Sequence, residues 1–152
     1  SEPHIIGLGQ NLPIDAETDI IELEDGRIFA ALRSNKENLH YAYSMDKGKT
    51  WEPAIDSGFR GQAPHLNRLS TGEILMALRL PNTSMYISSD DTKTWRGPYL
   101  IDNVFGAYAS TVELKDKSVL VVYYTEGPNS KVRARRFKLT DGEPVFLPVT
   151  KW

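Results

Sequence analysis

Three segments of the chain align without gaps, and this repeat constrains the fold more than any other feature. They read ELEDGRIFAALR, RLSTGEILMALR and ELKDKSVLVVYY. Their bounds are Glu22–Arg33, Arg68–Arg79 and Glu113–Tyr124. Each reads as a strand, a tight turn and a second strand rich in Ile, Leu and Val, as expected where both faces of a strand are buried. The central turn positions, Gly26, Gly72 and Lys117, lie 46 and 45 residues apart. Lys117 must form its turn without the glycine that such a hairpin favours.

A third strand is expected after each hairpin, over Leu39–Ser44, Ser84–Ser88 and Lys131–Leu139. In the first two repeats a polar loop follows, and a tryptophan opens a fourth strand. Four strands in about 45 residues are typical of a β-propeller blade. We therefore predict an all-β fold of about three four-stranded antiparallel blades, over residues 16–60, 61–105 and 106–150, with residues 1–15 as a lead-in or outer strand. A β-sandwich with accidental similarity is the alternative.

The composition excludes several classes of function. The 152 residues suffice for one domain with a core, and a formal net charge of −2 gives no strong attraction to nucleic acid or anionic membranes. No apolar run approaches the length of a membrane span. The absence of cysteine excludes disulfides, zinc–thiolate sites and cysteine nucleophiles. The three histidines have no metal-ligand spacing, so we expect no metal and no cofactor.

The polar loops SMDKGKTW (Ser44–Trp51) and SSDDTKTW (Ser88–Trp95) are nearly the same sequence. We expect Asp46 to accept hydrogen bonds from its own turn, Gly48 to be left-handed, and Trp51 to pack between neighbouring sheets. The loops offer too few carboxylates for a calcium cage. We interpret them as staples that close a blade.

Equivalent positions in successive blades should lie at equivalent places around the propeller axis. Counting back nine residues from each turn position gives Glu17, Ala63 and Tyr108. Counting forward seven gives Arg33, Arg79 and Tyr124. A glutamate or an arginine near a crowded axis needs a partner, so these positions are candidates for a functional site.

The polar loops resemble the Asp-box of the sialidase superfamily, whose members are six-bladed β-propellers. The first copy, Ser44–Trp51, matches the pattern Ser-x-Asp-x-Gly-x-Thr-Trp at every fixed position. The second has Thr92 in place of glycine, and the third blade has no box. The resemblance covers roughly residues 16–140, and it implies that the chain corresponds to the C-terminal half of such a propeller.

The resemblance extends to residues near the axis. Tyr108, in GAYASTVEL, is similar to the family's nucleophilic tyrosine, and Glu17, in AETDIIELEDG, to the glutamate that assists it. Arg33, in FAALRS, resembles one of the arginines that bind the substrate carboxylate. Arg79 is equivalent to Arg33 by count but lacks the family's preceding proline loop. Tyr124 lies where the family often places a glutamate that braces an arginine, and Glu126 is two residues further on.

The resemblance implies a glycoside hydrolase that removes terminal sialic acid or a related acidic sugar. A neutral phenol suits attack beside the substrate carboxylate, and tyrosine nucleophiles are the known exception among these enzymes. The family's acid/base aspartate belongs to preceding blades, so we expect the chain alone to be inactive. We expect it to associate with itself or with such blades, and the resemblance favours a secreted or periplasmic location. The alternative is a non-catalytic propeller that binds glycan or protein.

Overall fold

A computed structural model describes residues 2–148, except for the side chains of Asp15 and Ala107. The described residues form β-strands, turns and loops without a helix, so they include no helix that could cross a membrane. Positions 149 and 150 of the predicted third blade lie outside the described residues.

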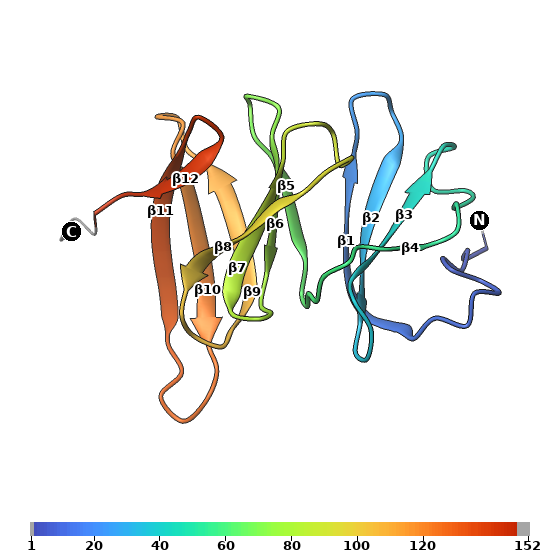
Figure 1. Cartoon of the computed structure of the whole chain (residues 1–152), viewed down its shortest axis with the longest axis horizontal. Coiled ribbons are helices and arrows are strands. Elements are labelled where there is room, and N and C mark those ends of the chain that lie inside the picture. The colour runs from blue at the N-terminus through green and yellow to red at the C-terminus, as the bar shows by residue number, and fades with distance from the viewer. Residues whose placement is uncertain (1, 149–152) are drawn as a thin grey trace.

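The strands form three antiparallel sheets of four strands, which lie side by side (Figure 1). The first contains β1 (Ile14–Glu22), β2 (Ile28–Ser34), β3 (His40–Ser44) and β4 (Ile55–Asp56). The second contains β5 (His65–Arg68), β6 (Ile74–Leu78), β7 (Thr83–Ser88) and β8 (Arg96–Asp102). The third contains β9 (Gly106–Glu113), β10 (Val119–Thr125), β11 (Val132–Thr140) and β12 (Glu143–Phe146). Each sheet runs in chain order from its first strand to its last. The sheets are the blades of a partial β-propeller, so the predicted fold class is confirmed.

The hairpin between the first two strands of each blade turns through a left-handed residue. Gly26 and Gly72 have φ of 84° and 104°, and Lys117 adopts 64° at the equivalent position. A side chain is uncommon in this region of backbone space. The third hairpin therefore keeps the turn of the other two without the help of glycine.

The two polar loops share one hydrogen-bond pattern, which confirms that Asp46 accepts hydrogen bonds from its own turn. Asp46 accepts the backbone N–H of Thr50 at 2.8 Å and the Thr50 hydroxyl at 2.7 Å, and Ser44 Oγ accepts the N–H of Gly48 at 2.8 Å. In the second loop Asp90 binds Thr94 and Ser88 binds Thr92 in the same way. Thr92 takes φ of 73° where Gly48 takes 83°. The missing glycine therefore leaves the loop geometry intact.

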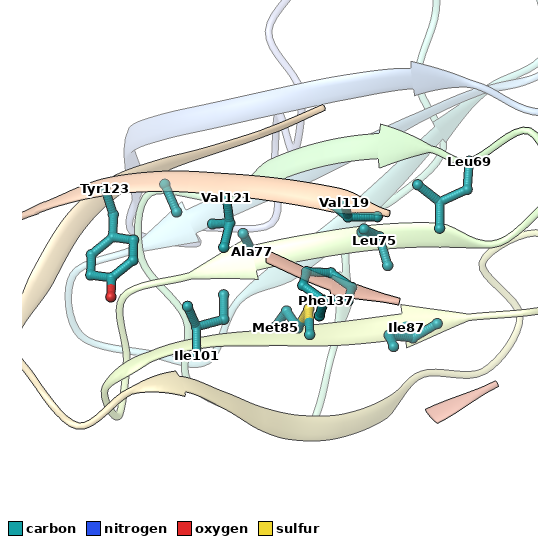
Figure 2. Packing of buried hydrophobic residues seen from close by; sticks show 11 residues of the cluster. Leu69, Leu75, Ala77, Met85, Ile87, Ile101, Val119, Val121, Tyr123 and Phe137 are labelled. Atoms are coloured by element: carbon teal, nitrogen blue, oxygen red, sulfur yellow. The ribbon is translucent and has the colours of Figure 1, made fainter. Parts of the chain in front are cut away.

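The blades pack through apolar side chains that lie between them. Phe29, Ala31 and Tyr41 of the first blade form one core with Met76 and Leu78 of the second. A second core, shown in Figure 2, joins the opposite face of the second blade to the third blade. It includes Leu75, Ala77, Met85, Ile87, Val119, Val121 and Phe137. The middle strand β6 is fully buried because both of its faces are covered.

The two loop tryptophans take different places. Trp95 of the second blade packs against Phe29 and Tyr41 of the first, with ring centroids 5.9 and 6.2 Å apart. Trp51 instead packs on the outer face of the first blade, in a small cluster that includes Ile6 and Ile14. The expectation that Trp51 lies between sheets is therefore wrong for the described residues, because the lead-in segment covers that face.

Candidate functional site

The first strands of the three blades, β1, β5 and β9, lie next to one another. Glu17 lies in β1, Ala63 precedes β5 by two residues, and Tyr108 lies in β9. The repeat count therefore places Glu17 and Tyr108 on the first strands of their blades and Ala63 just before the first strand of its blade.

Tyr108 has an unusual backbone conformation. Its φ is 47°, the same as that of Ala63 at the equivalent position in the second blade. The pairing of β9 with β10 shifts register between Val122 and Tyr124, which marks a bulge beside Tyr108. Bulges of this kind redirect a side chain, and left-handed non-glycine residues persist only where their surroundings hold them. Tyr108, beside this bulge, is 53% exposed.

The Tyr108 phenol reaches across the second blade's inner strand to the first blade. Its hydroxyl donates to Glu17 Oε1 at 2.8 Å. The other carboxylate oxygen of Glu17 accepts a hydrogen bond from Arg33 Nη1, and Arg33 Nη2 donates to Asn35 Oδ1 at 2.5 Å. Arg33 Nε is buried and has no partner among the described residues. Three of the four predicted site residues therefore form one connected chain.

The charges and hydrogen bonds around Tyr108 and Glu17 determine which of the two groups carries a proton at neutral pH. Burial favours the neutral form of Glu17, but hydrogen bonds from Tyr108, from its own backbone and from Arg33 outweigh burial and lower the pKa of Glu17. The hydrogen bond to Glu17 and the charge of that carboxylate raise the pKa of Tyr108. At neutral pH the proton thus resides on the phenol, and an ionised carboxylate is positioned to accept it.

Arg79 belongs to a neighbouring cluster. Its Nε donates to Gln62 Oε1 at 2.9 Å, and its Nη1 pairs with Glu126 at 3.0 Å. Its guanidinium also lies 5.5 Å from the ring centroid of Phe105. The positive charge of Arg79 partly offsets the rise in the pKa of Tyr108.

The sequence-based reasoning missed two partners of these arginines, Gln62 and Asn35. Asn35 could have been found by the same count, because Asn35 and Glu126 both follow their turn positions by nine residues. Asn35 accepts a hydrogen bond from Arg33, and Glu126 accepts one from Arg79. Gln62 occupies no repeated polar position, so the alignment gave no signal for it.

A cleft of about 210 Å³ opens beside Tyr108. Its lining includes Asp19, His65 and Ser110, which each precede their turn positions by seven residues. Asp19 Oδ2 accepts the backbone N–H of Leu66 at 2.7 Å and lies 3.6 Å from His65 Nδ1. The cleft beside Tyr108 therefore has polar side chains in its lining. The described residues hold no group of three or more metal-ligating side chains.

The link between Tyr108 and Glu17 predicts a measurable shift. In Glu17→Gln the negative charge beside the phenol is removed, so the pKa of Tyr108 should fall toward its ordinary value of about 10. Ultraviolet titration of the phenolate, with Tyr108→Phe subtracted, isolates this group. Glu22→Gln, which removes an exposed carboxylate from the same strand, should leave the titration unchanged. An unaltered Tyr108 titration in Glu17→Gln would contradict the observed contact.

Comparisons with known proteins support the fold. No family model and no curated relative matches the sequence. A protein of unknown function from Dyadobacter fermentans DSM 18053 is similar in structure, with a TM-score of 0.63, 25% identity, and coverage of 78% of this chain and 36% of its own.

Two solved glycoside hydrolases share the fold at low identity. An endo-1,4-beta-xylanase from Bacteroides thetaiotaomicron VPI-5482 has a TM-score of 0.60 and 12% identity, with 84% of this chain and 48% of its own covered. A thermostable family-43 glycoside hydrolase has a TM-score of 0.53 and 14% identity. The match covers 92% of this chain and 56% of the hydrolase. The chain spans less than two thirds of each of the three structures.

Proposed function

We propose that this chain is part of a sialidase-like glycoside hydrolase that acts on sialic acid or a related acidic sugar. The observation that carries the proposal is the chain of contacts from Tyr108 through Glu17 to Arg33. The resemblance of the polar loops to the Asp-box and the fold shared with two glycoside hydrolases support it.

In the proposed chemistry the Tyr108 phenol is the nucleophile and the ionised Glu17 carboxylate is the base. The Tyr108 oxygen attacks the anomeric carbon and forms a C–O bond, while the phenolic proton passes to Glu17 and the bond to the leaving oxygen breaks. The leaving oxygen takes a proton from an acid, which the family resemblance assigns to preceding blades. A phenol avoids the repulsion that a carboxylate nucleophile would meet beside the substrate carboxylate.

Arg33 and Arg79 are the proposed anchors for that substrate carboxylate. Guanidinium groups bind carboxylates through two parallel hydrogen bonds, a geometry that lysine does not reproduce. Both arginines are largely buried and braced by a glutamate, Arg33 by Glu17 and Arg79 by Glu126. Such bracing orients a guanidinium before the ligand arrives, which lowers the entropic cost of binding.

The test is calorimetric titration of the chain with N-acetylneuraminic acid. Arg33→Ala should weaken binding by at least about tenfold, or ~1.4 kcal/mol, because the carboxylate loses its partner. Arg33→Lys, which keeps the charge, should bind less tightly than the unmodified chain. Arg27→Ala removes an arginine that pairs with Asp25 in the first hairpin and should bind normally. Equal affinities in Arg33→Ala and Arg27→Ala, with both variants folded by circular dichroism, would refute the proposal and favour a non-catalytic propeller.

A further inference from the structure

A second cleft, of about 330 Å³, lies between the first and second blades. Its walls come from β3, β4 and the segment before β8, and its aromatic residues are Tyr41, Tyr43, Phe59 and Trp95. We call it the aromatic cleft. It shares no lining residue with the cleft beside Tyr108, so it is a separate feature of the molecule.

The aromatic walls are held firmly in place. Tyr43 Oη and the Thr92 hydroxyl form a hydrogen bond of 3.2 Å across the blade boundary, and Arg27 lies 5.0 Å from the Tyr43 ring centroid. Phe59 stacks on Tyr86, with centroids 3.9 Å apart and an interplanar angle of 12°. Rings fixed in this way offer flat apolar surfaces at little entropic cost to a ligand.

Two of these aromatic residues carry a buried polar group that lacks a hydrogen-bond partner among the described residues. Trp95 Nε1 is buried and forms no hydrogen bond within the described part of the chain. Tyr41, only 7% exposed, also has no well-formed hydrogen bond from its hydroxyl among the described residues, although the Ser57 hydroxyl lies close enough to influence its pKa. Buried donors normally find a partner, so two such groups at one cleft call for an explanation.

The rim of the cleft adds a hydrogen-bond acceptor. The Asp56 carboxylate accepts the backbone N–H of Gly58 at 2.7 Å and the Asn38 amide at 3.0 Å. These hydrogen bonds lower the pKa of Asp56, so it is ionised at neutral pH. An ionised carboxylate accepts hydrogen bonds from hydroxyl groups and repels anions.

We propose that the aromatic cleft binds a neutral saccharide unit, at a site distinct from the axial residues. A pyranose ring presents an apolar C–H face to aromatic rings and hydroxyl groups at its edge, which matches aromatic walls with a few fixed polar atoms. Asp56 and Lys93 both line the cleft and give it one negative and one positive charge, so it has no net charge that would favour an acidic sugar. This inference does not depend on the proposed function, because it uses different residues and a different class of sugar.

Nuclear magnetic resonance tests the site through the indole N–H of Trp95. Titration with cellobiose, lactose and xylobiose as neutral probes should shift that resonance for at least one of them, and N-acetylneuraminic acid should leave it in place. Absence of a shift with all three neutral probes would overturn the proposal. A shift of equal size with N-acetylneuraminic acid would also overturn it.

A variant locates the binding without disturbing the aromatic core. Ile55 lines the aromatic cleft and is 53% exposed, so Ile55→Glu should fold and should weaken the neutral probe by about tenfold. Leu100→Glu places the same charge on a half-exposed residue of an outer strand in the second blade and should bind normally. Equal weakening in both variants, or in neither, would contradict the assignment.

Discussion

Replacing Phe29 by alanine should lower the free energy of unfolding by about 3–5 kcal/mol, the usual cost of deleting a fully buried phenylalanine. Phe29 is completely buried, and its ring lies 5.0 Å from that of Tyr41 and 5.4 Å from that of Tyr43. It also contacts Trp95 across the blade boundary. The substitution thus opens a cavity in the core that joins the first two blades.

Urea denaturation followed by circular dichroism measures this loss. Phe105 is the matched control, because it is a phenylalanine that is 49% exposed. Phe105→Ala should cost less than about 1 kcal/mol, as is usual for changes outside a core. If the two variants were equally stable, the packing between the first and second blades would be wrong.

Self-association through the outer face of the third blade is the second large effect that we expect. The positions five residues after each turn are Ala31, Ala77 and Val122. Ala31 and Ala77 are completely buried because the next blade covers them, whereas Val122 is 36% exposed. Val112 pairs with Leu120 on the same face and is 51% exposed. The third blade therefore exposes apolar residues on the face that the first and second blades bury.

A second copy of the chain is the proposed occupant of this face in solution. Light scattering at micromolar concentration should then report a mass above the 17.1 kDa of one chain, because exposed apolar patches of this kind drive association. Val122→Glu should return the mass to that of a monomer. Met45→Glu, which alters an exposed loop residue of the first blade, should not. A monomer in the unmodified chain would contradict the prediction.

Much of the fold could be predicted because the residues that define the repeat determine the geometry of their immediate neighbours in the sequence. The turn positions Gly26 and Gly72 and the serine–aspartate loops act within a few residues, so their geometry follows from their own sequence. The third strands were expected at Leu39–Ser44, Ser84–Ser88 and Lys131–Leu139, and they form at His40–Ser44, Thr83–Ser88 and Val132–Thr140. Repeated spacing then placed Glu17 and Tyr108 on the first strands of the first and third blades, with β5 of the second blade between them.

Features that depend on contacts between distant segments could not be predicted in this way. Trp51 and Trp95 occupy equivalent loop positions, but the lead-in segment covers one and the first blade covers the other. The bracing of Arg79 by Gln62 and Glu126 joins residues 17 and 47 positions apart. The left-handed backbone of Tyr108 depends on a bulge between β9 and β10. None of these has a local signature in the sequence.

Tyr108, Glu17 and the two arginines are proposed to form a site for an acidic sugar. The most direct measurement compares the affinity of the chain for N-acetylneuraminic acid and for its methyl ester, in which an added methyl group removes the charge of the carboxyl group. We expect at least about tenfold tighter binding of the free acid, with a smaller difference in Arg33→Ala, in which only Arg79 of the two proposed anchors remains. Equal affinity for the acid and the ester would contradict it.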